Sequence, residues 1–271
     1  MWVNGELVEA AADARISAID AGVVTGNGVF EALKVTAHGP FAVQRHLDRL
    51  DRSARALAMP RPDHAFIRTG IDAVLDGRTF VDGKIRITYT AGAGPLGSQA
   101  AFGPPTVVVA ADRRELAPAS AVVVTSPWTR NEHGALAGVK SISYAENVRT
   151  LAYAHERGAS EAILLNTAGH VCEGTGSNLF CVFGSRIVTP PLVSGPLAGI
   201  TRDLVLEWSD VQEQDLTLVE AMTADEVFLT SSLRDVQAVH RWDALELASP
   251  GPVTQAVIRT FAQRSAANLE P

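Results

Sequence analysis

The amino-acid sequence predicts an α+β fold of two domains. Stretches with the character of β-strands outnumber stretches with helical periodicity, and the two kinds are not strictly interleaved along the chain. The chain has 271 residues, of which 46% are apolar and 20% charged, which is ordinary for a globular protein that buries a sizeable core. We therefore expect mixed sheets and helices rather than a doubly wound parallel sheet.

Turn signals and periodicity define the elements of the N-terminal domain, residues 1–112. Asn4-Gly5 suits a tight hairpin turn, and the His-Gly-Pro run at 38–40 separates two further strand-like stretches. Helices are expected where apolar residues such as Leu47 and Leu50 share one stripe, and strands where apolar and polar residues alternate. The expected elements are the hairpin 2–8, the strands 29–35 and 41–43, the helices 45–58 and 64–76, and the strands 84–90 and 106–111.

A charged, proline-containing stretch from Asp112 to Ala119 indicates a linker between domains, which we set at residues 113–120. The larger C-terminal domain then covers residues 121–271. Its expected elements are the strand 121–125, a helix near 144–157 that stops at Gly158, the strands 161–165, 179–183 and 186–189, a helix near 201–208, the strand 227–230 and a helix near 253–265.

Composition excludes several classes of function. A net charge of −7 and a pI near 5.5 argue against a nucleic-acid partner, which would require a basic face. No apolar run is long enough for a membrane span, and no signal peptide is visible, so we expect a cytoplasmic protein. Cys172 and Cys181 are too few for a disulfide framework and lack the spacing of metal ligands, so no metal is expected.

Lys140 is the most informative residue, because the chain has only three lysines among its 23 basic residues. A desolvated lysine loses its proton readily, whereas an arginine does not. Lys140 follows Gly-Val and precedes a small polar run and a predicted helix. The sequence therefore indicates a lysine that is present for its chemistry, as an amine that forms an imine.

Four further segments complete a constellation around this amine. Glu173 is a carboxylate among apolar and small residues, so it needs a cationic partner or a proton. Gly199–Arg202 opens a helix and Leu229–Ser232 ends a strand, and both offer backbone N–H groups and hydroxyls to an anion. Arg49 has a guanidinium suited to bidentate phosphate binding. An imine-forming amine, an acid for a pyridinium and a phosphate site together indicate pyridoxal 5′-phosphate (PLP).

With these pieces in place, the chain resembles the class IV aminotransferase family, the fold-type IV PLP enzymes. That family includes branched-chain and D-amino-acid transaminases and 4-amino-4-deoxychorismate lyase. The resemblance covers nearly the whole chain and implies a two-domain fold like that of D-amino-acid aminotransferase. Its matching motifs are Gly28–Glu31, His46–Leu50, Lys140, Glu173–Phe180, Gly199–Arg202 and Ser231-Ser232.

The resemblance implies a role for each matching residue. Lys140 would be the catalytic Schiff-base lysine, and Glu173 would face the pyridine nitrogen. Tyr144, aligned across a one-residue gap, resembles a tyrosine beside the phenolic oxygen of PLP. Four residues would hold the phosphate: Arg49, Ile200, Thr201 and Ser232. The family also implies a homodimer with its active site between the two domains.

The substrate remains open between a lyase and a transaminase. Phe30 stands where D-amino-acid transaminases typically have a tyrosine, and residues 91–98 lack the cations of their loop, so that subtype is not expected. Arg86 falls where a strand cation binds a substrate carboxylate, although an exposed strand residue is an equally good interpretation. The runs 128–131 and 140–147 look most like bacterial lyases of folate biosynthesis. We therefore expect release of 4-aminobenzoate and pyruvate, with transamination of branched-chain or other amino acids by 2-oxoglutarate as the alternative.

Overall fold

The computed structural model describes residues 1–78, 80–101 and 103–271. The chain divides into two units. The N-terminal unit contains Met1–Glu115, Val139–Ser143 and Leu269–Pro271, and the C-terminal unit contains Leu116–Gly138 and Tyr144–Asn268. The short segment that carries Lys140 therefore belongs to the N-terminal unit, whereas the expected domain boundary at residues 113–120 would place it in the C-terminal domain.

One six-stranded sheet forms the N-terminal unit, in the order β2-β1-β6-β5-β3-β4. All its pairs are antiparallel. The strands are β1 (Trp2–Val3), β2 (Glu6–Leu7), β3 (Gly28–Thr36), β4 (Gly39–Pro40), β5 (Asp82–Thr90) and β6 (Thr106–Arg113). Trp2 pairs with Leu7 across the expected Asn4-Gly5 turn. On β5, Ile85 and Ile87 are buried and Arg86 between them is exposed, as alternation requires.

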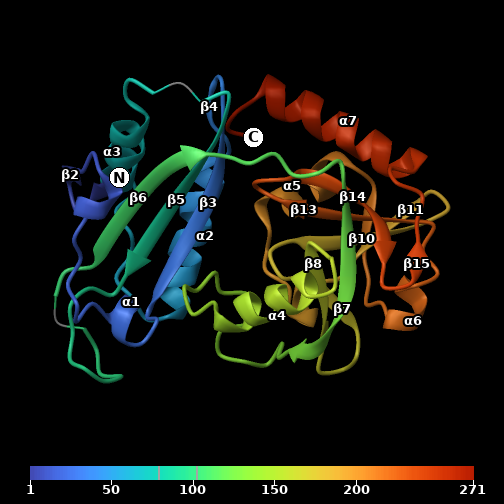
Figure 1. The fold of residues 1–271 in the computed structure, drawn as a ribbon, viewed down its shortest axis with the longest axis horizontal. Coiled ribbons are helices and arrows are strands. Elements are labelled where there is room, and N and C mark those ends of the chain that lie inside the picture. The colour runs from blue at the N-terminus through green and yellow to red at the C-terminus, as the bar shows by residue number, and fades with distance from the viewer. Residues whose placement is uncertain (79, 102) are drawn as a thin grey trace. The chain divides into compact units, whose positions relative to one another are not determined.

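α2 (Val43–Ala56) and α3 (His64–Leu75) cover one face of this sheet (Figure 1). The 3₁₀ turn η1 (Ala11–Asp13) and the short helix α1 (Ala21–Val24) precede them in the chain. α2 packs on β3 and α3 packs on β6. Leu47 and Leu50 are fully buried, which confirms the predicted stripe. Asp63 caps α3 by accepting a hydrogen bond of 3.0 Å from the Phe66 N–H, which fixes where that helix begins.

A nine-stranded sheet forms the C-terminal unit, in the order β12-β11-β10-β13-β14-β7-β8-β9, with β15 paired to β14. Its strands are β7 (Ser120–Arg130), β8 (Glu161–Asn166), β9 (Val171–Gly174), β10 (Asn178–Phe183), β11 (Arg186–Thr189), β12 (Val211–Glu213), β13 (Glu226–Ser231), β14 (Asp235–Trp242) and β15 (Leu245–Glu246). Parallel and antiparallel pairs occur together, as in the pairs of β7 with β8 and β8 with β9. This mixture confirms the α+β class.

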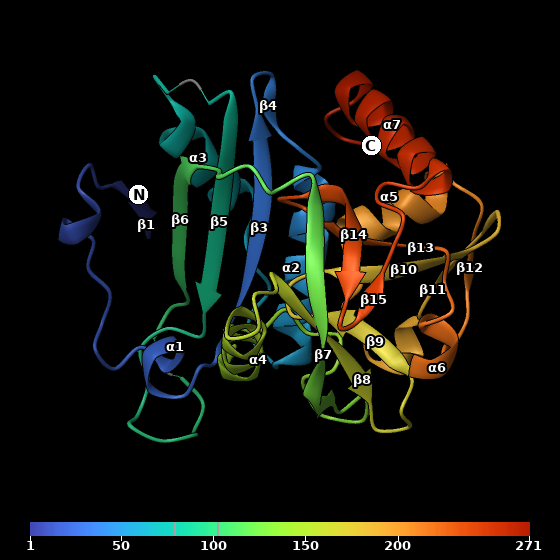
Figure 2. The ribbon, with the colours of Figure 1, turned by 45° about the vertical axis from the view of Figure 1, so that its right-hand side comes forward.

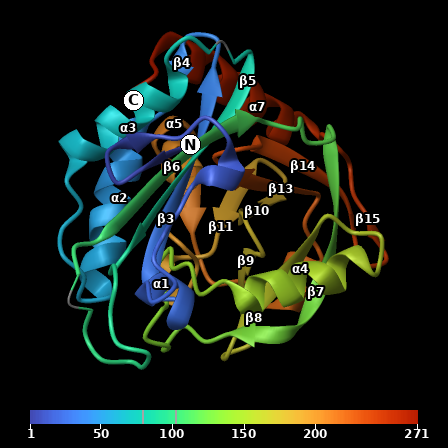
Figure 3. The same cartoon turned by 60° about the vertical axis from the view of Figure 1, so that its left-hand side comes forward.

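The helices of the C-terminal unit lie on different parts of its sheet. They are α4 (Ala145–His155), α5 (Ile200–Trp208), α6 (Leu218–Ala221) and α7 (Pro252–Ala267), with the 3₁₀ turn η2 (Leu192–Ser194). α4 packs on β7 and β8, whereas α5 and α7 contact each other and β13 (Figures 2 and 3). No helix in the described part of the chain has both the length and the apolar character needed to cross a membrane.

Several predicted boundaries were wrong for identifiable reasons. The strand expected at 41–43 is absent, because Ala42 adopts a left-handed backbone (φ 56°) and precedes α2 directly. The strand expected at 121–125 extends to Arg130, with a register shift around Pro127, which has no N–H for the ladder. β9 and β14 were not predicted. β14 contains Gln237, His240 and Arg241, so its apolar pattern is weak although its backbone pairs with three strands.

Candidate active site

Lys140 lies beside β3 in the N-terminal unit. Its carbonyl oxygen accepts a hydrogen bond of 3.0 Å from the Phe30 N–H, and its own N–H donates to the Ser53 hydroxyl at 3.3 Å. The Ile142 N–H donates to the Gly28 carbonyl at 2.9 Å. A Cβ atom at Gly28 would lie 2.9 Å from the backbone carbonyl oxygen of Tyr89 on β5, so a side chain at this position would require the backbone to shift. The lysine backbone is therefore held by the sheet and by α2.

The side chains of Lys140, Phe30 and Arg86 come together on the sheet face opposite the helices. Lys140 Nζ lies 4.5 Å from the centroid of the Phe30 ring, and Arg86 Cζ lies 4.0 Å from it. Phe30 is buried, whereas Arg86 is exposed. The face of an aromatic ring attracts both cations. The structure thus brings three residues predicted from the sequence together, with the Lys140 amine and the Arg86 guanidinium beside the Phe30 ring.

Arg49 lies on the helix side of β3, in a buried ion pair. Its Nε and Nη2 atoms donate to the two carboxylate oxygens of Glu31, at 2.8 and 2.6 Å, and His46 Nδ1 lies 2.6 Å from the same carboxylate. Burial opposes ionisation of Glu31, but the charge and hydrogen bonds of Arg49, with those of His46, hold the pKa of Glu31 well below its usual range. Sequence reasoning included Glu31 in the Gly28–Glu31 motif but gave it no role, because its pairing with Arg49 depends on how α2 packs on β3.

Glu173, on β9 of the C-terminal unit, has the cationic partner that its sequence context required. The Leu197 N–H donates to one of its carboxylate oxygens at 2.9 Å, and Arg130 Nε lies 3.3 Å from the other. Arg130 ends β7, and its guanidinium also lies 3.6 Å from Glu146. In the sequence, Arg130 was noted only as part of the run 128–131. Its place beside Glu173 depends on the pairing of β7, β8 and β9, which no local signal reveals.

Tyr144 directly precedes α4, and its hydroxyl donates to the Thr175 carbonyl at 3.3 Å. The Asn147 side-chain amide donates to the same carbonyl at 2.6 Å. Tyr144 is therefore directed towards the loop that follows Glu173. Its assignment to the phenolic oxygen of PLP stays a prediction.

The expected anion site of the C-terminal unit has the features that a phosphate requires. Within the described part of the chain, no side chain caps α5 by a hydrogen bond, and Ile200 and Thr201 at its N-terminus are buried. Ser232 lies in the turn between β13 and β14. Among the described residues, the buried hydroxyls of Ser177 and Thr230 have no hydrogen-bond partner. An uncapped helix N-terminus and unsatisfied buried hydroxyls are both features that suit an anionic ligand.

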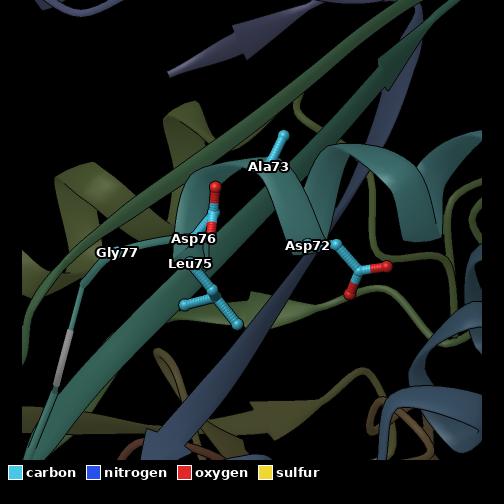
Figure 4. Close-up of a pocket in the computed structure, with 5 residues that line it drawn as sticks. All are labelled: Asp72, Ala73, Leu75, Asp76 and Gly77. Atoms are coloured by element: carbon cyan, nitrogen blue, oxygen red, sulfur yellow. The ribbon is translucent and has the colours of Figure 1, made fainter.

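Other candidate features do not support chemistry. A surface hollow at the end of α3 is lined by Asp72, Ala73, Leu75, Asp76 and Gly77 (Figure 4), and none of the candidate residues borders it. Over the described ranges, no cluster of His, Cys, Asp and Glu could hold a metal ion. Burial raises the pKa of the Cys172 thiol far above its usual value and that of Cys181 to about 12, so both are unreactive thiols.

Comparisons with known proteins agree with this geometry. Residues 28–242 match the family model described as Amino-transferase class IV. A Methanocaldococcus jannaschii protein named "Putative branched-chain-amino-acid aminotransferase" is 34% identical over 267 residues, covering 90% of this chain and 88% of that protein. The branched-chain aminotransferase of Thermoproteus uzoniensis, solved with norvaline, has a TM-score of 0.90 at 26% identity and covers 97% of this chain and 93% of that one.

A second solved structure comes from another branch. The Legionella pneumophila protein named "Putative 4-amino-4-deoxychorismate lyase" has a TM-score of 0.87 at 25% identity, covering 94% of this chain and 97% of that one. The similarity of both structures confirms the fold expected from the sequence.

Proposed function

Because this chain belongs to the class IV aminotransferase family of PLP-dependent enzymes, we propose that it transfers the amino group of an apolar amino acid to a dicarboxylic keto acid. The observation that carries this proposal is the Phe30 ring, which has the Lys140 amine at 4.5 Å and the Arg86 guanidinium at 4.0 Å. An apolar ring beside the reactive amine suits an apolar side chain. A guanidinium beside the same ring suits the second carboxylate of the acceptor.

PLP, when bound, withdraws electrons from the substrate Cα. The chain offers a group for each part of that cofactor. Lys140 would bind its aldehyde carbon and, once displaced, would move the Cα proton as a base. The Glu173 carboxylate would keep a proton on the pyridine nitrogen. The N-terminus of α5, with the other predicted phosphate ligands, would bind the phosphate. These are proposed roles, supported by the donors and acceptors described above.

A product assay tests the proposed reaction. Purified enzyme is mixed with a panel of amino donors and 2-oxoglutarate, and the absorbance of the cofactor is followed. We expect an apolar amino acid to convert the aldehyde form of the cofactor to the amine form, and 2-oxoglutarate to restore the aldehyde. If no donor produces this change, the enzyme is not an aminotransferase of this type.

Arg86→Leu is expected to raise the KM for 2-oxoglutarate by about tenfold or more, because a charge-assisted hydrogen bond to its distal carboxylate is lost. The matched control is Lys84→Leu, which removes a cation from the same face of β5, two residues away. Steady-state kinetics with a fixed donor provide the measurement. An equal effect of the two substitutions would remove Arg86 from the substrate site.

The second candidate is the lyase that the sequence favoured. Residues 91–98 hold no cation, and this loop is packed closely, since a Cβ at Gly92 would lie 1.9 Å from the Pro104 carbonyl oxygen. A loop of small residues suits a cyclohexadiene ring that bears two carboxylates. Release of 4-aminobenzoate and pyruvate from aminodeoxychorismate, without any keto acid, would favour the lyase over the aminotransferase.

Arg49→Lys is expected to lower PLP affinity by about tenfold, because a guanidinium has five N–H donors and can bind both Glu31 and a phosphate, whereas a compact ammonium beside Glu31 cannot do both as well. Lysine keeps a charge beside Glu31, so the substitution avoids an uncompensated buried carboxylate. The matched control is Arg45→Lys. Arg45 lies on the same helix, and its Nε atom donates a hydrogen bond to the Pro271 carbonyl. Titration of apoenzyme with PLP measures the affinity. Unchanged affinity in a folded Arg49→Lys protein would exclude Arg49 from the phosphate site.

A homodimer and a cytoplasmic location stay predictions. Light scattering of the purified protein would test the first.

A further inference from the structure

Glu161, the first residue of β8, is a buried carboxylate that none of the roles above uses. Its side chain is 1% exposed. One carboxylate oxygen accepts hydrogen bonds from the Thr175 hydroxyl at 2.5 Å and from the Gly176 N–H at 3.0 Å. The other oxygen pairs with the guanidinium of Arg234. Glu161 is thus bonded on one side to the loop after Glu173 and on the other side to an arginine.

The loop held by Glu161 is the one that begins at Glu173. Glu173 and Gly174 still pair with β8, opposite Leu164 and Ile163. The chain then turns, and the Gly174 N–H donates to the Ser177 carbonyl at 2.8 Å. A Cβ at Gly174 would lie 2.9 Å from the Glu161 carboxylate, so the carboxylate is packed directly against the turn. Any shift of Glu161 would therefore move the residues next to Glu173.

Arg234 belongs to a different segment, the turn between β13 and β14. The backbone N–H of Arg234 donates to the Ser231 carbonyl at 3.2 Å, and this bond closes the turn that contains Ser232. The far end of the Glu173 loop meets this turn by strand pairing, since Asn178 at the start of β10 pairs with Thr230 of β13. The Glu161–Arg234 ion pair adds a side-chain link at the near end of the loop, where Thr175 and Gly176 bind Glu161.

Stability alone is a weak reason for this arrangement. Taking two charges out of water has a cost that the ion pair offsets only with good geometry and further hydrogen bonds, and apolar residues of similar volume often stabilise a fold equally well. A buried ion pair does, however, fix the positions of the groups that it joins. Functional side chains must be held within about 0.5 Å of their productive geometry, and supporting hydrogen bonds provide that restraint.

We propose that Glu161 and Arg234 are positioning residues that set the Glu173 carboxylate and the Ser232 hydroxyl at the separation required by the two ends of PLP. The inference rests on the cofactor roles proposed for Glu173 and Ser232. It does not depend on whether the enzyme is an aminotransferase or a lyase. Glu161 itself acts through the loop and the turn, without touching the reacting atoms.

Glu161→Gln is the main test, because it keeps the size of the side chain and removes its charge. We expect the apoenzyme to fold and its affinity for PLP to fall by about tenfold or more, as for other residues that orient ligand-binding groups. Affinity for pyridoxal, which lacks the phosphate, should fall by less than about twofold, because pyridoxal uses only one of the two ends that the pair aligns. Absorbance titration of the apoenzyme measures both affinities, and circular dichroism checks the fold.

The matched control is Glu226→Gln. Glu226 is another buried glutamate of the same sheet, and it accepts hydrogen bonds from the Val253 and Thr254 N–H groups at the start of α7. Arg234→Lys, which keeps the charge, should restore much of the PLP affinity lost in Arg234→Gln. Double substitution of Glu161 and Arg234 by Gln should cost little more than either single change, because the two residues act as a unit.

The outcomes separate this inference from the proposed reaction. Equal losses of PLP and pyridoxal affinity in Glu161→Gln, or a loss no larger than in Glu226→Gln, would reduce the pair to a structural role and overturn the proposal. If Glu161→Gln does not fold, Arg234→Gln is compared with Arg234→Lys instead. Equal losses of PLP and pyridoxal affinity in Arg234→Gln, or no recovery of PLP affinity in Arg234→Lys, would then overturn the proposal. Failure of the aminotransferase assay with normal PLP binding would overturn the reaction and leave the positioning role standing. Unchanged PLP affinity in Ser232→Ala would remove the premise and overturn the positioning role.

Discussion

Replacement of Lys140 by alanine is expected to reduce turnover by at least about 10³-fold, because the substitution removes both the amine that binds the cofactor and the base that moves the substrate proton. The fold should survive, since the backbone of residue 140 is held by its hydrogen bonds to Phe30 and Ser53, which the side chain does not make. Turnover at saturating PLP, with thermal unfolding of the same sample, provides the measurement.

The control for Lys140 uses the scarcity of lysine in this chain. Lys84→Ala removes a lysine of the same unit that pairs with Asp112 at the sheet surface, and it should leave turnover unchanged. Borohydride reduction of the wild-type enzyme followed by peptide mapping should label Lys140. A label on Lys34 or Lys84, or no label at all, would refute the assignment.

Substitution of Glu173 by glutamine is expected to have the second largest effect. A neutral amide cannot hold a proton on the pyridine nitrogen as firmly, so kcat should fall by about 10²-fold or more while PLP stays bound. Arg130 lies 3.3 Å from the Glu173 carboxylate. An amide in its place would leave the Arg130 guanidinium without an anionic partner at this position, which raises the free-energy cost of the substitution. Stopped-flow measurement of Cα deprotonation on PLP-saturated enzyme tests this result.

Glu226→Gln again serves as the matched control, since it removes a buried carboxylate from β13 without altering any proposed cofactor ligand. Glu173→Gln should slow deprotonation and leave the unfolding temperature of the apoenzyme close to that of the control. If Glu173→Gln turns over at the wild-type rate when fully occupied by PLP, Glu173 does not face the pyridine nitrogen.

Local signals were sufficient for most of the fold. The Asn4-Gly5 turn, the stripe of α2 that includes Leu47 and Leu50, and the alternation of β5 each depend on residues a few positions apart. Such patterns are visible in the sequence, because period and turn chemistry act over short distances. Errors arose at Ala42 and in β14, where backbone geometry or neighbouring strands override weak side-chain preferences.

The sequence by itself determined the family and the cofactor, and it supplied the residues proposed here to carry the chemistry, because motifs around Lys140 and Glu173 specify functional groups by type and order. Only the tertiary structure decided which groups surround them. Glu31 faces Arg49 across a gap of 18 positions, and Arg234 reaches Glu161 across 73. Charged partners so far apart leave no periodic signal, because strand pairing and burial, rather than sequence spacing, bring their side chains together.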